Sequence, residues 1–195
     1  MTVDIKKVKE LRDRTNVGLS SCKAALVKAN NDVEKAIVEL KKEGKIKAAK
    51  VSHKEVKAGS IFNYIHHNKQ TASFVEILCQ TEAAANTEQF KDFGESVCLQ
   101  IVSMSPKWLS SADVPEDLVN EQREIFEAQI GKVPEDKKVH VVNNKLKKWF
   151  SLVCLMDQRS VVFPGKTIEA LREELVQQTQ ENVVVKRFAH WKVGD

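Results

Sequence analysis

Apolar residues in the first 50 positions recur at helical spacing in three short runs, which predicts three helices. Gly18 permits a turn after the first run, and the second run begins at Ser20, a good N-cap residue. The third opens with Asn31 and Glu34 in capping-box register, and Gly44 is expected to end it. So short a segment buries little surface, so residues 1–50 are predicted to form a small docking module. Its predicted buried positions are Val3, Val8, Leu11, Cys22, Ala25, Leu26, Ala29, Val33, Ala36, Ile37 and Leu40.

A lysine-rich stretch follows over residues 41–57, and its apolar period stops after Ala49. Cationic segments attract phosphate, so a nucleic-acid contact is one interpretation. The arginine and aromatic side chains that usually accompany such contacts are absent from this stretch. We therefore expect an exposed basic linker at 51–57 and no direct nucleic-acid binding.

Two strands are predicted next, at residues 60–66 and 73–80. In the second, Val75, Ile77 and Cys79 alternate on one face, which indicates a half-buried strand. The polar run between the two strands has the length of a β-hairpin turn.

A short corner, residues 81–85, follows the second strand. Asn86 and Gln89 stand in capping-box register, and helical spacing of the apolar residues starts at Phe90. We expect an exposed corner between a strand and a helix. Rigid elements on both sides of a surface corner are typical of a site that contacts a partner.

Four helices and one strand are predicted for the rest of the chain. The helices cover 87–104, 115–130, 134–156 and a segment from Ile168 onward, and residues 182–193 alternate as a strand. The apolar seam of 134–156 is long and narrow, which is typical of a helical hairpin or a coiled-coil-like arm. Its members are Val139, Val142, Leu146, Trp149 and Val153.

This order, β-β-α-α-α-α-β after the first three helices, predicts an α+β fold. Residues 1–50 form a three-helix domain, 51–57 the linker, and 58–195 an antiparallel sheet with helices packed on one side and a helical arm at 134–156. The other face of the sheet is then free to meet a partner. Its candidate residues are Phe62, Phe188 and Trp191.

The composition is that of an ordinary folded protein of 195 residues, 42% hydrophobic and 30% charged. No window approaches the roughly 18 to 20 apolar residues of a membrane span, so none is expected. The N-terminus resembles neither a signal peptide nor a transit peptide. We expect a cytoplasmic protein, with an organelle matrix as the alternative if a targeting segment has been removed.

Four cysteines, Cys22, Cys79, Cys98 and Cys154, lie far apart and fit no metal or redox spacing. We expect each to be a small, reduced core residue in a reducing compartment. The net charge of +4 is too small and too diffuse to indicate a nucleic-acid partner by itself.

No catalytic constellation is present in the sequence: it contains no Gly-rich phosphate loop, GxSxG, HExxH or paired CxxC motif. The nearest candidate is the His66–His67 pair at a strand end. Adjacent strand residues point to opposite faces, so these two imidazoles are not expected to share a metal. We expect no catalytic residue, no metal and no cofactor, and a function by binding.

Several blocks of the chain resemble translation elongation factor Ts. The segment 8–26 is similar to the family pattern VKELRxxTGAGMxxCKxAL. The resemblance covers nearly the whole chain and matches the short, single-core form of the family. The further matching blocks are 32–37, 44–50, 59–61, 64–68, 145–149, 185–188 and 193–194.

The resemblance implies a protein that exchanges guanine nucleotides by binding the GTPase elongation factor Tu (EF-Tu). It implies that the N-terminal domain is ubiquitin-associated-like (UBA-like) and grips the GTPase, while the core sheet docks elsewhere on the same partner. In the family, the corner after the second core strand carries Thr-Asp-Phe-Val, and its Phe is wedged into the GTPase. Carried over to this chain, the contact residues are Leu11, Arg12, Leu19, Ser20, His66, Thr81, Glu82, Ala83 and Ala84.

The chain departs from the family pattern at both contact points. At the corner, Glu82 replaces Asp and Ala83 replaces the wedge Phe. In the N-terminal motif, Asn16 replaces Gly and Ser20 replaces an apolar residue. Two hypotheses follow: an exchange factor that binds EF-Tu, or a diverged paralogue that has lost exchange and serves a larger assembly, such as a ribosome or an organellar complex. Both hypotheses are compatible with a homodimer.

Overall fold

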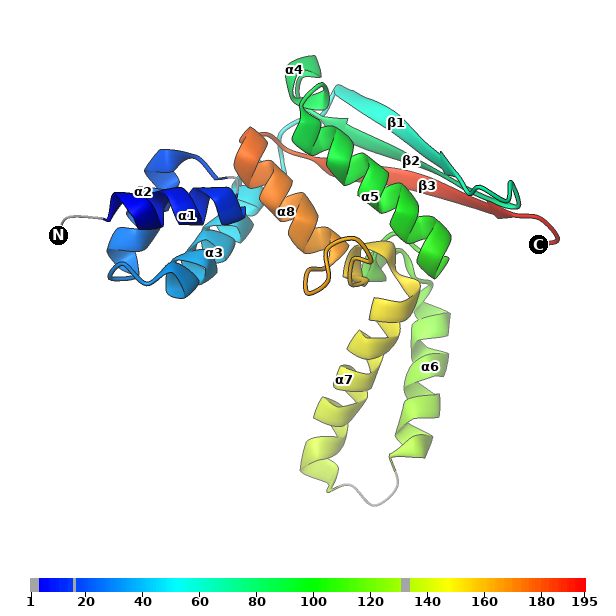
Figure 1. Ribbon diagram of the computed structural model, residues 1–195. Helices are drawn as coiled ribbons and strands as arrows, with labels where there is room; N and C mark the ends of the chain where they lie inside the picture. The colour runs from blue at the N-terminus through cyan, green and yellow to red at the C-terminus, as the bar shows by residue number, and fades with distance from the viewer. Residues whose placement is uncertain (1–3, 16, 131–133) are drawn as a thin grey trace. The chain divides into compact units, whose positions relative to one another are not determined.

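The computed structural model describes residues 4–15, 17–130 and 134–195. Within them lie eight α-helices, three β-strands and two 3₁₀ turns (Figure 1). This composition confirms the predicted α+β class. The elements are α1 (Ile5–Thr15), α2 (Leu19–Lys28), α3 (Val33–Val51), β1 (Ala58–Ile65), β2 (Thr71–Cys79), α4 (Glu82–Ala85), α5 (Glu88–Met104), η1 (Ser111–Asp113), α6 (Glu116–Gln129), α7 (Glu135–Val153), η2 (Leu155–Asp157), α8 (Ile168–Thr179) and β3 (Val184–Lys192).

Backbone contacts divide the chain into two compact units. The first comprises Met1–Ser60, Ile77–Phe93 and Ala170–Val185, and the second comprises Ile61–Glu76, Gly94–Glu169 and Lys186–Asp195. Helices α1 to α4 therefore belong to the first unit, and α6 and α7 belong to the second.

The first three helices share one apolar core. Asp32 is the N-cap of α3, and its carboxylate accepts the Lys35 backbone N–H at 3.0 Å. The cap thus lies one residue after the predicted Asn31, because Asn30 and Asn31 take positive φ values of 51° and 61° in the turn after α2. The core consists of Val8, Leu11, Val17, Cys22, Ala25, Leu26, Ala29, Ala36 and Leu40.

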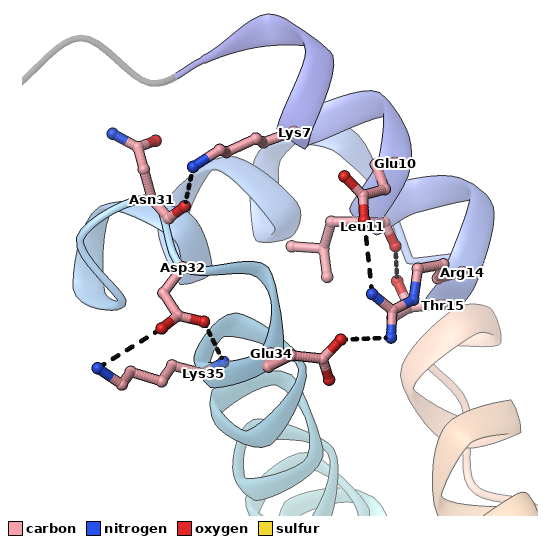
Figure 2. A network of polar contacts seen from close by, with 9 residues as sticks. All are labelled: Lys7, Glu10, Leu11, Arg14, Thr15, Asn31, Asp32, Glu34 and Lys35. Carbon is pink, nitrogen blue, oxygen red and sulfur yellow. Dashed lines mark hydrogen bonds and ion pairs between the residues drawn. The ribbon is translucent and has the colours of Figure 1, made fainter.

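Polar contacts connect α1 to the start of α3 (Figure 2). The Lys7 ammonium donates to the Asn31 carbonyl at 2.7 Å, and the Arg14 guanidinium donates to Glu34 at 2.8 Å. Arg14 also pairs with Glu10 on its own helix at 3.5 Å. Because the Arg14 ion pairs are exposed, we assign most of the stability of the three helices to their core.

The prediction that Gly44 ends the third helix is wrong, because α3 continues to Val51. Gly44 is buried, and a Cβ built on it would lie 3.1 Å from the Gln177 side-chain oxygen and 3.9 Å from the Glu173 carbonyl. The glycine therefore allows the close approach of α8 to α3.

The sheet has the strand order β1-β2-β3. The predicted hairpin turn is confirmed: the His66 N–H donates to the Thr71 carbonyl at 2.9 Å, and Lys69 takes a φ of 57°. Alternate residues of β2 are buried, as predicted, and the Ser73 hydroxyl donates to the Cys98 carbonyl of α5 at 2.9 Å. One face of the sheet is thus covered by α5 (Figure 1).

Phe62 of β1 lies on the face covered by α5, and not on the open face as predicted. A Cβ built on Gly94 of α5 would lie 2.3 Å from the Phe62 ring. The aromatic ring therefore occupies the space that a side chain at position 94 would need.

The open face of the sheet carries exposed apolar side chains. Ile61 is 67% exposed and Trp191 is 62% exposed, with the Trp191 ring 5.2 Å from that of Phe74. Arg187 pairs with Glu76 at 2.6 Å on this face. A shallow pocket of about 300 Å³ lies here, lined by Ile61, Phe74, Val75, Glu76, Arg187, Phe188 and Ala189.

Helices α6 and α7 form a helical hairpin (Figure 1). The Lys145 ammonium donates to the Gln129 amide oxygen at 3.3 Å and lies over the Phe126 ring. Val142 and Leu146 of the predicted seam are buried, whereas Val139 is 67% exposed and does not belong to it.

A buried amide pair connects α5 to the segment after η2. The Gln100 amide donates to the Gln158 side-chain oxygen at 2.9 Å, and its own oxygen accepts the Val161 N–H at 2.9 Å. Both glutamines have no exposed surface, so their hydrogen bonds offset the cost of burying two amides.

All four cysteines are free and buried, which confirms their predicted role as core residues. Burial raises the pKa of the Cys98 and Cys154 thiols to about 11. Among the described residues, no helix combines the length and the apolar character needed to cross a membrane.

We predict that Gly94→Ala destabilises the protein, because the added methyl group would overlap the Phe62 ring. Overpacking of this kind costs about 1–3 kcal/mol, which corresponds to roughly 2–4 °C in melting temperature per kcal/mol. Thermal denaturation followed by circular dichroism measures the change. Gly18→Ala is the control, since no atom lies within 4 Å of its Cβ position. Equal melting temperatures for the Gly94 variant and wild type would contradict the packing described.

We predict that Asp32 stabilises the fold above, but not below, its folded-state pKa. The Lys35 N–H holds the pKa of the Asp32 carboxyl below its usual 3.8. The contribution is therefore complete above the unfolded-state value of 3.8 and is lost as the pH falls through the lower folded-state value. Melting temperatures of wild type and Asp32→Asn, measured from about pH 6 to about pH 2, should converge at the acid end. A constant difference across this range would refute the assignment.

Candidate functional site

The predicted corner after β2 is exposed at Thr81, Glu82 and Ala83, and residues 82–85 form a single helical turn, α4, that was not predicted. Thr81 is its N-cap, and the Thr81 hydroxyl accepts the Ala84 N–H at 3.2 Å. Asn86 caps the other end of α4, where its side-chain amide donates to the Glu82 carbonyl at 2.9 Å. The predicted capping box at Asn86 therefore does not open α5.

The cap of α5 is supplied one residue later. The Thr87 hydroxyl accepts the Phe90 N–H at 3.3 Å and donates to the Ala84 carbonyl at 2.7 Å. Phe90 has no exposed surface. The corner is thus fixed at its C-terminal end by a capped helix with a buried aromatic anchor.

A distant carboxylate fixes the N-terminal end of the corner. One oxygen of Glu181 accepts the backbone N–H groups of Gln80 and Thr81, at 3.1 and 3.0 Å. The other oxygen accepts the Thr81 hydroxyl at 2.7 Å. Sequence analysis missed Glu181, since it lies 100 residues from Thr81 and no local motif marks it.

The corner exposes part of the predicted contact set. Thr81, Glu82 and Ala83 are exposed, whereas Ala84 is only 5% exposed and packs inward. The corner therefore exposes the carboxylate of Glu82 and the methyl group of Ala83, and Ala84 packs beneath them.

A second candidate surface lies on the N-terminal helices. Arg12 and Ser20 are exposed, and the apolar Leu19 at the start of α2 is 48% exposed. Leu11 has no exposed surface and belongs to the core of these helices. Its predicted role as a contact residue is therefore corrected to packing. Asn16, the other departure in this motif, lies outside the described residues.

His66 lies just after the end of β1, where its imidazole Nδ1 is 3.2 Å from the Tyr64 hydroxyl. Its ring centroid is 4.2 Å from that of His67. The expectation that the two imidazoles point apart is wrong, because β1 ends at Ile65 and the alternation of strand side chains ends with it.

In the described part of the chain, no group of three or more His, Cys, Asp and Glu side chains is placed to hold a metal. The candidate residues offer exposed apolar, hydroxyl and charged groups on rigid elements. Chemically, such surfaces can recognise another protein.

Comparison with known proteins identifies the family. The family model described as "Elongation factor TS" matches residues 5–195. The chain is 38% identical over 197 residues to a protein named elongation factor Ts from Petrotoga mobilis, with 100% of both chains covered. It is also 38% identical to the protein of that name from Thermosipho melanesiensis, over 99% of this chain and 100% of the relative.

A third relative, elongation factor Ts from Fervidobacterium nodosum, is 34% identical over 197 residues and is covered over its full length. The match extends from the N-terminal helices through the sheet, the helical hairpin and the last strand. It includes both candidate surfaces, the corner and the surface around Leu19. This protein therefore belongs to the elongation factor Ts family.

Proposed function

We propose that this protein binds EF-Tu and promotes the release of GDP from it. The observation that carries the proposal is the family match over residues 5–195, which includes the exposed corner at Thr81–Ala83 and the exposed Leu19 surface. A factor of this kind makes and breaks no covalent bond and works through binding alone. It acts wherever EF-Tu works, in a bacterial cytoplasm or, as the alternative, in an organelle matrix.

Exchange by binding follows from thermodynamic linkage. A protein that binds the empty GTPase more tightly than the GDP-bound GTPase must lower the affinity for GDP by the same factor. The corner is suited to this task, because rigid backbone at both of its ends keeps the contact surface in one conformation before binding.

Ala83 weakens this action, because a methyl group fills little space in a partner. Loss of an aromatic anchor at an interface costs on the order of 2 kcal/mol, or a factor of roughly thirty. We infer that exchange by this chain is slow and that the N-terminal surface around Leu19 supplies a large share of the affinity.

Ala83, which stands where the family pattern has Phe, also favours a second function. A chain that keeps the fold and the N-terminal surface but lacks the wedge can serve as a structural or regulatory subunit of a larger assembly. Such a chain would bind EF-Tu or another partner without accelerating GDP release. Purification with a ribosome or an organellar complex would favour this alternative.

The open face of the sheet favours self-association. Ile61 and Trp191 are exposed there, and Arg187 is already paired with Glu76. A second copy would present the same apolar surface, so two such faces can cover one another around a two-fold axis without leaving a charge unpaired. We propose a homodimer formed through this face.

The exchange proposal predicts that the chain accelerates release of labelled GDP from EF-Tu and that Ala83→Phe accelerates it further. The added ring restores the missing anchor, so the second-order rate constant should rise by roughly thirtyfold. Ala112→Phe, a matched change at an exposed alanine of η1, should leave the rate unchanged. Stopped-flow fluorescence measures the rate of GDP release with wild type and with each variant. Wild type that binds EF-Tu without accelerating release would instead support the structural alternative.

The dimer proposal predicts that Ile61→Lys yields a monomer, because a buried ammonium without a partner strongly disfavours the interface. Sedimentation equilibrium of wild type should give twice the chain mass of 22.0 kDa. Ile5→Lys is the matched control, since Ile5 is 81% exposed on α1, and it should remain dimeric. Monomeric wild type at micromolar concentration would reject the interface.

A further inference from the structure

The segment that precedes β3 holds the corner through one carboxylate. Glu181 accepts three hydrogen bonds from the start of the corner, two from backbone N–H groups and one from the Thr81 hydroxyl. Hydrogen bonds to a charged acceptor are roughly twice as strong as neutral ones.

The segment that carries Glu181 is itself anchored through the two residues that follow Glu181. The next residue, Asn182, is 3% exposed and donates to the carbonyls of Ser52 and Lys54, at 3.2 and 2.9 Å. The guanidinium of Arg172 donates to the Val183 carbonyl at 2.8 Å. The carboxylate is therefore presented from a fixed backbone, to which it ties the N-terminal end of the corner.

The hydrogen bond from Thr81 to Glu181 also orients the cap of α4. A hydroxyl group has one hydrogen and two lone pairs. Because the hydrogen points to Glu181, a lone pair is available for the Ala84 N–H, which lies 3.2 Å from the oxygen. A four-residue helix such as α4 cannot sustain itself in water, so the cap decides whether Glu82 and Ala83 are held in place.

We propose that Glu181 is a positioning residue for partner binding: its carboxylate holds Gln80 and Thr81 so that Glu82 and Ala83 are presented in one fixed geometry. This inference rests on the proposed function, because it assumes that the corner meets EF-Tu. It adds a residue that lies outside the contact set implied by the family pattern. Because Ala83 fills little space, affinity at the corner depends strongly on a preformed backbone.

The chemistry of the carboxylate distinguishes this role from general packing. A glutamine at position 181 can still accept the two N–H groups with its oxygen. Its amide nitrogen would face the Thr81 hydroxyl and make that hydroxyl an acceptor, so that the hydroxyl hydrogen loses its partner. An alanine removes all three bonds. We therefore expect the corner to be held most firmly in wild type, less firmly in Glu181→Gln and least firmly in Glu181→Ala.

The first measurement follows the corner without a partner. Hydrogen–deuterium exchange of the full-length chain reports on the amides of Gln80, Thr81 and Ala84. Exchange should be faster by roughly tenfold or more in Glu181→Ala and by less in Glu181→Gln. Glu43→Gln is the matched control, because it breaks the 2.7 Å ion pair with Lys28 and leaves the corner untouched. Unchanged exchange at these amides in Glu181→Ala would overturn the inference.

The second measurement is the affinity for nucleotide-free EF-Tu, by titration calorimetry. We expect Glu181→Ala to bind roughly tenfold more weakly than wild type, with Glu181→Gln intermediate and Glu43→Gln equal to wild type. Faster hydrogen–deuterium exchange at the corner with an unchanged affinity for EF-Tu would also overturn the inference. If wild type itself does not bind EF-Tu, the proposed function fails, and the positioning role fails with it. Wild-type binding that survives in Glu181→Ala rejects the positioning role alone.

Discussion

The packing of α5 against the covered side of the sheet is the interaction on which the candidate site depends. Phe62 fills the space left by Gly94, and the Ser73 hydroxyl bonds to the Cys98 carbonyl. The corner is the connection between β2 and α5, so its two ends are set once the strand and the helix are set. A shift of either element would move the contact residues, because dense packing transmits strain rather than absorbing it.

Helix α5 covers one face of the three-stranded sheet and leaves the other face exposed to water. Ile61 and Trp191 are exposed on that face. Exposed apolar residues scattered singly are ordinary, whereas a contiguous apolar patch is typical of an interaction surface. The second copy that we propose for this face would give the sheet the two-sided burial that a single chain does not provide.

The corner has a small side chain at its tip and a backbone that is held at both ends. Ala83 offers only a methyl group, yet the backbone around it is held by Glu181 at one end and by Thr87 and Phe90 at the other. A preformed surface loses less conformational entropy on binding than a flexible one. In the exchange that we propose, this rigidity would offset part of what the missing aromatic ring would contribute, and the exposed Leu19 would add an apolar contact elsewhere on the chain.

The sequence by itself determined the α+β class, the hairpin at 67–70, the helices that became α6 and α7, and the family, because these follow from local periodicity and from motifs that can be read along the chain. Only the tertiary structure showed that Gly44 lies inside a helix, that Leu11 is buried and that Glu181 holds the corner. The reason is physical. A glycine that ends a helix and one that admits a neighbour look alike in sequence, and a carboxylate 100 residues from its partner leaves no local pattern.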